Sequence, residues 1–237
     1  MKVTVLIPAF NEETNITRTL SGIRAFEKDF CKKHDIQLDV LVIDDCSEDK
    51  TAEKSEKTGV KVIKLANNLG KGGAIQEGLK YANGNIIVFL DADLKESSLE
   101  VSKLIMPILN NESDVTIAKF NPSGHKGGFG LVKSLAFYGV KFFTGKEITS
   151  ALSGQRAFKK QVLSQLKVIP SGYGLEVGML IDILKNGFRV KEVEVDMFHD
   201  VTGRDLKGFV HRGKQFIDIL KILIIKIGER KSSCFKY

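Results

Sequence analysis

The sequence has no tryptophan, four tyrosines and three cysteines among its 237 residues. Cys31, Cys46 and Cys234 are odd in number, far apart and not in a zinc-binding spacing, so neither a disulfide framework nor a zinc site is predicted. We therefore expect a reducing, cytoplasmic compartment. The few aromatic rings are not interleaved with basic residues, which disfavours a nucleic-acid-binding module despite the net charge of +7.

Long hydrophobic runs are also absent. The apolar stretch at residues 3–8 is too short and too strand-like for a signal peptide. The run "FIDILKILIIKIG" near the C-terminus is broken by Lys221 and Lys226 and is shorter than the roughly 20 residues that a bilayer requires. We expect one domain over residues 1–211, followed by a basic amphipathic helix and tail over residues 212–237.

Negative charge is missing from two stretches. No acidic residue lies between Asp114 and Glu147, and basic residues dominate from Arg212 to Lys236. This bias indicates an anionic partner, either a phosphorylated substrate or a membrane surface. The amphipathic segment at residues 131–143 and the tail are compatible with peripheral binding to the cytoplasmic face of a membrane. Packing of their apolar faces within the domain or in a homodimer is an equally open interpretation.

Apolar periodicity predicts alternating strands and helices along the first half of the chain. Strands are expected at residues 3–8, 40–44, 60–65 and 86–90, and helices at residues 12–33, 47–57, 71–81 and 97–109. A further strand at 114–119, helices at 131–143 and 174–185, and a strand at 188–197 follow. This order is typical of an α/β fold, a mostly parallel central sheet with helices on both faces.

Polar clusters follow each of the first four strands. They read "IPAFNEE", "VIDDCSEDKT", "ANNLGKGGAIQEG" and "FLDADLK". Because ligands bind at the carboxyl ends of strands in open α/β sheets, the four clusters predict one shared ligand site. The first cluster lacks Gly-x-Gly-x-x-Gly, and "LGKGGA" lacks the first glycine and the Ser/Thr of a P-loop, so dehydrogenase and kinase classes are disfavoured.

The Asp-x-Asp pair, Asp91 and Asp93, ends the fourth expected strand. Taken alone, the pair has two interpretations: the carboxylates hold a metal ion or a ligand hydroxyl, or Asp93 caps the helix that follows.

Read as a set, "PAFNEE", "IDDCSEDKT", "NNLGKGGA" and "DAD" resemble the family 2 glycosyltransferases of GT-A fold, which include dolichyl-phosphate mannose and glucose synthases. "SGQRAFKK" and "GYGLEVGMLIDILKNGFRVKEVEV" extend the resemblance, which covers residues 3–215. "GYGLEVG" and the His199 segment also resemble glucosyl-3-phosphoglycerate synthases, which retain anomeric configuration.

The resemblance implies transfer of a hexose from a nucleotide diphosphate sugar, of UDP-glucose or GDP-mannose type, to a phosphorylated or lipid-linked acceptor. Polyprenyl phosphate is preferred to a small soluble acceptor such as 3-phosphoglycerate. A sugar nucleotidyltransferase, the remaining alternative, would carry a Gly-rich loop after the first strand, and "PAFNEE" is unlike one.

The resemblance also implies which residues bind the donor. Pro8, Ala9, Phe10 and Glu12 would line the nucleoside pocket, and Asp45 would reach the base or ribose. The diphosphate and sugar side would be formed by Gly70, Lys71, Asp91 and Ala92. Plainer interpretations are that Glu12 favours a helix dipole and that Gly70 merely permits a turn at a helix start.

A metal ion, Mg²⁺ or Mn²⁺, is implied at the Asp-x-Asp pair. Asp93 would be the direct ligand and Asp91 a ligand directly or through water, since hard cations prefer carboxylate oxygens. By resemblance, His199 would close the metal site, with Asp200 as the alternative. Arg204 would hold a phosphate.

Catalysis depends on the acceptor. In an inverting transfer, Glu176 would act as base toward a hydroxyl acceptor, but "LEVG" replaces the common Glu-Asp pair, and a phosphate acceptor is already anionic and needs no base. Glu176 would then position the acceptor. Arg156 and Gln155 are expected to line the acceptor or diphosphate side, because arginine binds phosphate through two parallel hydrogen bonds. A surface role for Glu176 and Arg156 is the plainer alternative.

Overall fold

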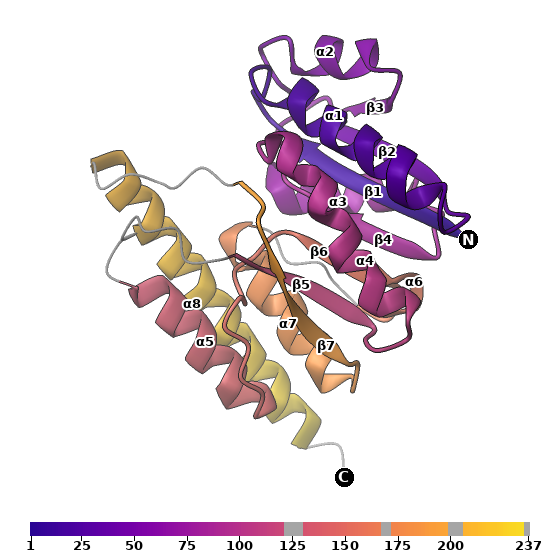
Figure 1. Ribbon diagram of the computed structural model, residues 1–237. Coiled ribbons are helices and arrows are strands. Elements are labelled where there is room, and N and C mark those ends of the chain that lie inside the picture. Colours follow the sequence, from indigo (N-terminus) through magenta and orange to yellow (C-terminus); the bar gives the residue numbers. More distant parts are fainter. Residues whose placement is uncertain (121–129, 167–171, 199–205, 235–237) are drawn as a thin grey trace.

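The computed structural model describes residues 1–120, 130–166, 172–198 and 206–234, although the side chains of Tyr173 and of residues near both ends of the last segment are not described. Within these ranges one sheet forms the centre of the molecule, with strands in the order β3-β2-β1-β4-β6-β5-β7 (Figure 1). The strands are β1 (Lys2–Ala9), β2 (Gln37–Asp44), β3 (Lys61–Lys64), β4 (Ile86–Phe89), β5 (Val115–Phe120), β6 (Arg156–Lys159) and β7 (Val190–Val195).

The α-helices alternate with these strands through the first half of the chain. They are α1 (Ile16–Phe26), α2 (Thr51–Lys57), α3 (Gly70–Leu79), α4 (Val101–Leu109), α5 (Leu131–Thr144), α6 (Lys160–Ser164), α7 (Leu175–Lys185) and α8 (Leu206–Cys234). Shorter turns are a π-helix, η1 (Glu27–Cys31), and two 3₁₀ turns, η2 (Lys95–Glu100) and η3 (Gly172–Gly174). The predicted α/β fold with a mostly parallel sheet is confirmed.

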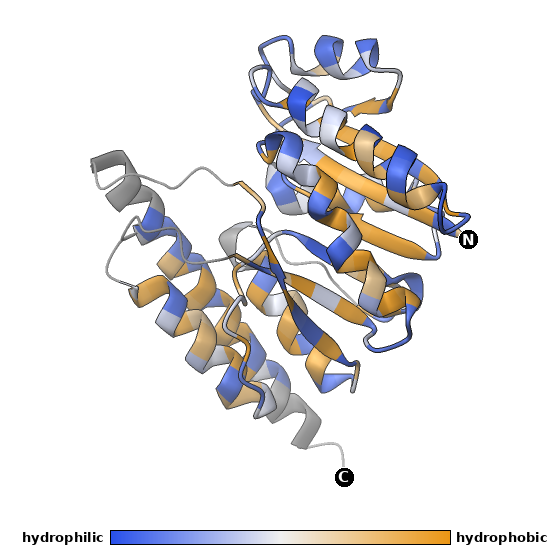
Figure 2. Cartoon of the chain, in the orientation of Figure 1, coloured by the Kyte–Doolittle hydropathy of each residue, from blue (hydrophilic) through white to orange (hydrophobic). Residues whose placement is uncertain are grey.

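Both faces of the sheet are buried because the central strands are apolar on both sides (Figure 2). Val3 and Val5 of β1 pack into one core with α1 and α4, whereas Leu6 packs into the other with α3, α5, α7 and α8. Successive side chains of a strand point to opposite faces, so the central strands contribute to both cores. Such burial fixes the strand ends, where the polar clusters begin.

One strand was not predicted. β6 runs antiparallel between β4 and β5, with Arg156 opposite Phe89 and Lys159 opposite Ile86. Because of this direction, the residues just before β6 lie beside the residues just after β4. The antiparallel insertion therefore brings "SGQ" at 153–155 to the same edge as Asp91.

The first helices begin later than periodicity predicted. The helices expected from residues 12 and 47 begin at Ile16 and Thr51. The intervening polar residues join the two loops instead: the backbone N–H of Asn11 donates to Ser47 Oγ at 3.0 Å, and that of Glu12 donates to Thr51 Oγ1 at 2.7 Å. The helix predicted at residues 97–109 also differs in its start, because a 3₁₀ turn, η2, already begins at Lys95.

The C-terminal helix does not start where a separate tail was expected. α8 begins at Leu206, so the boundary proposed between residues 211 and 212 lies inside a helix. Ile219 and Leu223 of α8 are buried in the same core as α5 and α7. The helix is thus part of the domain, as the packing interpretation of the tail required. Within the described ranges, no helix combines the length and apolarity needed to cross a membrane.

An ion cluster around the buried Asp114 carboxylate fastens β7 to the sheet. Asp114 accepts hydrogen bonds from the Arg189 side chain at 3.1 Å and from Lys159 Nζ at 2.8 Å. Hydrogen bonds from Arg189 are the main cause that holds the pKa of Asp114 well below its usual range, while burial acts in the opposite direction.

We expect Asp114→Asn to lower the free energy of unfolding by about 2 kcal/mol at neutral pH, since a buried charged acceptor is lost. A carboxyl with a depressed folded-state pKa stabilises above its unfolded pKa of about 3.9. The difference between wild type and variant should therefore be constant above about pH 5 and shrink as the pH falls further. Urea unfolding at several pH values measures it, with exposed Asp29→Asn as control; a difference that persists unchanged at pH 2 would contradict the assignment.

Candidate active site

The predicted residues meet at the carboxyl edge of the sheet. A cavity of about 300 Å³ opens there between the ends of β1, β2 and β4. Its lining consists of Pro8, Ala9, Phe10, Glu12, Asp45, Lys71, Asp91, Ala92 and Asp93. All nine were expected from the sequence to bind a nucleotide sugar or metal, and the fold brings them to one place.

One side of the cavity has an exposed aromatic ring, that of Phe10, beside a buried carboxylate, that of Asp45. Phe10 is exposed, whereas Asp45 is buried and its Oδ1 accepts a hydrogen bond from the backbone N–H of Leu69 at 2.7 Å. Glu12 Oε2 accepts one from Asn15 Nδ2 at 2.9 Å. These bonds hold both carboxylates in place, and an exposed apolar ring can flank a heterocyclic base.

The other side of the cavity is a charge cluster centred on Lys71. Its Nζ lies 2.7 Å from Asp91 Oδ1 and 3.3 Å from Glu176 Oε1. Burial alone lowers the pKa of Lys71, but the two carboxylates outweigh it and leave the pKa above its usual value. Lys71 therefore stays protonated and joins the first turn of α3 to β4 and α7.

Gln155 fixes the second oxygen of Asp91. Its Nε2 donates to Asp91 Oδ2 at 2.6 Å, and Ser153 Oγ donates to Gln155 Oε1 at 3.3 Å. Gln155 is buried and does not line the cavity. The structure thus places Gln155 behind Asp91, where it orients that carboxylate.

Arg156 lies differently from the expectation. Its side chain is 2% exposed and donates to the backbone carbonyls of Ser153, Ala151 and Glu176, at 2.8, 2.7 and 2.9 Å. Burial lowers the pKa of Arg156 to about 10, although the charge of Glu176 acts in the opposite direction. Arg156 does not reach the cavity surface, because β6 points it into the protein. Its bonds instead fasten the 151–153 loop to the start of α7.

The alternative role of Asp93 as a helix cap is not supported. The helical turn that follows has Leu94 at its N-cap position. Asp93 lines the cavity beside Asp91. Gly70, at a positive φ of 71°, starts α3 immediately before Lys71, and a Cβ there would meet nothing within 4 Å.

The remaining predicted ligands fall outside the described residues. His199, Asp200 and Arg204 lie in the 199–205 segment. Among the residues that the structure does describe, no group of three or more His, Cys, Asp or Glu side chains is arranged to hold a metal ion. The described part of the site supplies two carboxylates, Asp91 and Asp93, which are hard oxygen donors of the kind that Mg²⁺ and Mn²⁺ prefer.

Sequence comparison settles the family. Residues 4–167 match the family described as glycosyl transferase family 2. The chain belongs to this family. It is 32% identical to an uncharacterised protein of Methanocaldococcus jannaschii over 82% of this chain and 80% of that one. It is 31% identical to dolichol-phosphate mannosyltransferase of Pyrococcus furiosus over 86% of this chain and 58% of that enzyme.

Structural comparison agrees with this assignment. Glucosyl-3-phosphoglycerate synthase from Mycobacterium tuberculosis, solved with Mn²⁺, UDP and phosphoglyceric acid, superposes with a TM-score of 0.74 at 25% identity. The match covers 94% of this chain and 78% of that chain. The predicted family, the GT-A fold and the glycosyltransferase class are confirmed.

Gly154 is a site residue that was not predicted from the sequence. A Cβ at this position would lie 2.2 Å from Lys71 Nζ and 3.2 Å from Asp91 Oδ2. The backbone of residue 154 therefore covers the Lys71–Asp91 ion pair so closely that a side chain would displace it. The only signal in the sequence was the position of this glycine directly before Gln155 and Arg156.

We expect Gly154→Ala to weaken donor binding about tenfold, because the new methyl group occupies the place of the Lys71 ammonium group, which would face the diphosphate. The melting temperature should change little, since the displaced atom is the end of a flexible side chain. Calorimetric titration with UDP-glucose and GDP-mannose measures the effect. Gly213→Ala is the control, because a Cβ there meets nothing within 4 Å; wild-type affinity in Gly154→Ala would show that the close approach is irrelevant to the donor.

Proposed function

We propose that this glycosyltransferase moves a hexose from a nucleoside diphosphate sugar to polyprenyl phosphate, with Mg²⁺ or Mn²⁺ as cofactor. The observation that supports the proposal is the division of one cavity into an apolar side at Phe10 and a charged side at Lys71, Asp91 and Asp93. A nucleoside diphosphate sugar has the same division, with a planar base at one end and a charged diphosphate at the other.

The donor would lie along the strand ends. Its base would stack against Phe10, and Asp45 would accept hydrogen bonds from the base or ribose. Lys71 would face the diphosphate, because the N-terminal turn of α3 and an ammonium group both favour an anion. Asp91, held by Gln155, would bind hydroxyls on the sugar and ribose side.

The metal would be held by Asp93 and, directly or through water, by Asp91. His199 remains the proposed third ligand. When bound, the cation neutralises the negative charge of the diphosphate leaving group. Its use is supported by the solved synthase structures that contain Mn²⁺ or Mg²⁺.

Binding of the donor would change the contacts of Lys71. Without the donor, Lys71 balances Asp91 and Glu176. A diphosphate would attract the ammonium group and leave both carboxylates free for a metal and an acceptor. Glu176, whose side chain is mostly buried beside Lys71, would then position the acceptor.

A small phosphorylated acceptor such as 3-phosphoglycerate is the second candidate. It is favoured by the likeness to glucosyl-3-phosphoglycerate synthase. The two acceptors differ in chemistry: polyprenyl phosphate attacks through an anionic oxygen, whereas phosphoglycerate attacks through a hydroxyl whose proton must be removed.

Metal-dependent donor binding is the first test. We expect Mn²⁺ with UDP-glucose or GDP-mannose to raise the melting temperature by several degrees, since a ligand at about 100 times its Kd contributes about 2.7 kcal/mol. Asp93→Ala should abolish the part of the shift that depends on Mn²⁺, while exposed Asp29→Ala should keep it. An unchanged shift in Asp93→Ala would refute the assignment of the metal site.

Glu176→Gln separates the two acceptors. With polyprenyl phosphate we expect the turnover rate to fall less than about tenfold, because no proton is removed; loss of a general base for a hydroxyl acceptor costs 10²- to 10⁴-fold. Radiolabelled hexose transfer to each acceptor measures the two rates. Glu77→Gln, which also removes an ion pair with a lysine, is the matched control. No transfer to polyprenyl phosphate by the wild type would exclude the first candidate.

A further inference from the structure

The outer side of α8 carries an apolar stripe on the protein surface. Ile217, Leu220, Ile224 and Ile227 are spaced by three or four residues, so they share one side of the helix. Each is between 42% and 58% exposed. The inner side of the same helix, with Ile219 and Leu223, is already buried in the core. The stripe is thus additional to the apolar surface that the fold requires.

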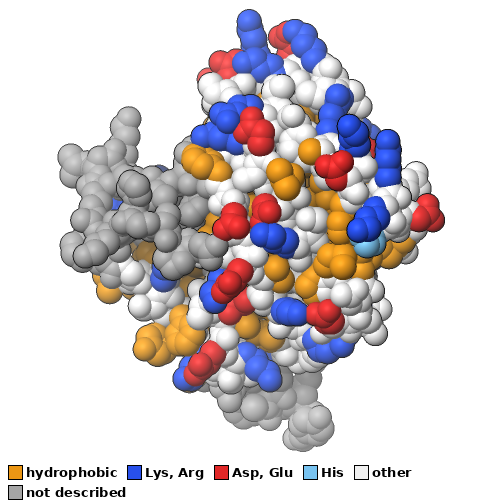
Figure 3. Space-filling model, in the orientation of Figure 1, with side chains coloured by type: hydrophobic (Ala, Val, Ile, Leu, Met, Phe, Trp, Pro, Cys, Tyr) orange, Lys and Arg blue, Asp and Glu red, His pale blue; other side chains and the backbone are white. Residues whose placement is uncertain are grey.

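Helix α5 carries a matching stripe. Leu131, Tyr138 and Phe142 are each about two-thirds exposed and also share one helix side. They face outward, because Ala136 and Val140 on the opposite side are buried. Figure 3 shows hydrophobic side chains on the surface at the lower left, where Figure 1 places α5.

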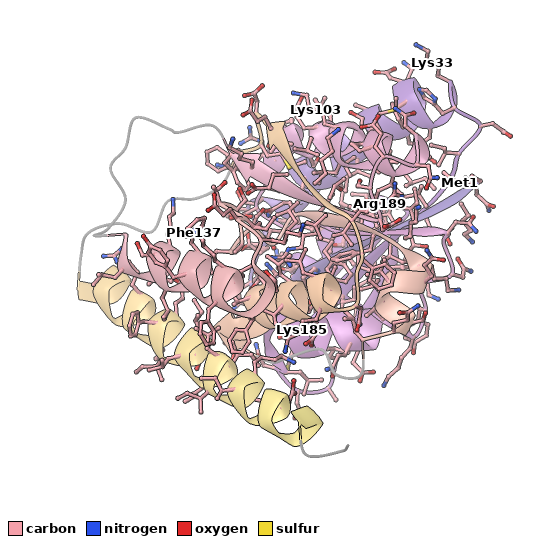
Figure 4. All side chains as sticks on the ribbon, turned by 90° about the horizontal axis from the view of Figure 1, so that it is seen from below. Met1, Lys33, Lys103, Phe137, Lys185 and Arg189 are labelled. Carbon is pink, nitrogen blue, oxygen red and sulfur yellow. The ribbon has the colours of Figure 1, made fainter. Side chains whose placement is uncertain are left out.

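The two stripes form one surface, which we call the α5/α8 face. A Cβ at Gly139 would lie 2.8 Å from Leu223 Cδ2, so the two helices touch at this glycine. Tyr138 and Phe142 flank Gly139 on α5, and Leu220 and Ile224 flank Leu223 on α8. Figure 4 shows α5 and α8 side by side along one side of the molecule. A contiguous exposed apolar surface on a folded domain is typical of an interaction site.

The charge around the α5/α8 face indicates which kind of partner binds there. Lys141 lies one turn beyond Tyr138, and Lys214 and Lys221 lie one turn on either side of Ile217, so exposed lysines flank both stripes. Two of the three also have an acidic partner, Glu147 for Lys141 and Asp218 for Lys221. α5 itself carries no acidic residue. A second copy of this chain would bring lysines against lysines, whereas an anionic bilayer offers a hydrocarbon layer for the stripes and negative headgroups for the lysines.

The face lies near the catalytic edge of the sheet. The inner side of α8 packs against η3: a Cβ at Gly174 would lie 3.0 Å from the backbone oxygen of Asp218 and 3.2 Å from Ile222 Cβ. Gly174 precedes α7 by one residue, and Glu176 is in the first turn of α7. One helix thus separates the α5/α8 face from the residue proposed to position the acceptor.

We propose that the α5/α8 face docks on the surface of an anionic lipid bilayer. The inference deepens the proposed function, on which it rests for its biological meaning, by assigning the side from which a lipid-linked acceptor arrives. It does not use any residue of the cavity, so the two proposals can fail separately.

Co-sedimentation with vesicles tests the docking. The full chain is mixed with vesicles of phosphatidylcholine alone or with about 30% phosphatidylglycerol, a composition chosen to give a strongly negative surface. We expect the partition coefficient to be at least tenfold higher on the anionic vesicles. Leu220→Gln/Ile224→Gln should lower it at least tenfold, because both side chains leave water on docking.

Charge reversal gives a second, independent readout. Each lysine near an anionic surface contributes roughly fivefold to binding, so Lys214→Glu/Lys221→Glu should reduce partitioning by well over tenfold. Lys32→Glu/Lys33→Glu changes net charge by the same amount at the other end of the molecule, where Figure 4 labels Lys33. Leu99→Gln is the control for loss of an exposed leucine. Both controls should bind vesicles more tightly than the face variants do.

Two results would overturn the proposal. One is equal partitioning of wild type and both face variants. The other is a dimer in sedimentation velocity that Leu220→Gln/Ile224→Gln converts to a monomer, without vesicle binding by the wild type, which would assign the face to a second copy. Mn²⁺ and nucleotide sugar should raise the melting temperature of the face variants as much as that of the wild type. If they did not stabilise the wild type at all, the result would count against the proposed function and not against the docking face.

Discussion

The ion pair between Lys71 and Asp91 is the interaction on which the site depends. It joins the start of α3 to the end of β4, and the contact of Lys71 with Glu176 extends it to α7. Gln155 holds the other oxygen of Asp91, and Gly154 leaves room for the ammonium group. Four separate segments of the chain therefore meet at one half-buried cluster of opposite charges, and the position of each segment sets the charge that the others face.

This balance explains the antiparallel strand in an otherwise parallel sheet. If β6 ran parallel to β4, its carboxyl end would face the cavity, and the residues before it would lie at the opposite edge. The observed direction brings Gln155 to Asp91 and turns Arg156 inward. There the guanidinium group binds three backbone carbonyls and so fixes both the 151–153 loop and the start of α7. The positions of Gln155 and Glu176 thus follow from one strand.

The sequence predicted the cavity well because the place where a strand ends is a local property. The end of a buried apolar run predicts where each parallel strand ends. The polar residues that follow Ala9, Asp44 and Phe89 then lie close together, because parallel strands end at the same edge of the sheet. It could not predict the place of Arg156, because burial depends on which carbonyls lie nearby after folding. The close approach at Gly154 and the joined loops at Asn11 and Ser47 are likewise tertiary contacts, which single-residue preferences do not encode.

The structure shows that one side of the basic C-terminal segment packs into the domain. The pattern of α8 contains two apolar sides, and periodicity alone cannot assign them to core or surface. Burial of Ile219 and Leu223 identifies the side of α8 that packs into the core. The stripe from Ile217 to Ile227 lies on the other side and stays exposed after folding. Folding and docking would therefore use opposite sides of one helix. Because that helix abuts the turn before Glu176, a membrane bound on its outer side would place lipid headgroups beside the acceptor end of the cavity.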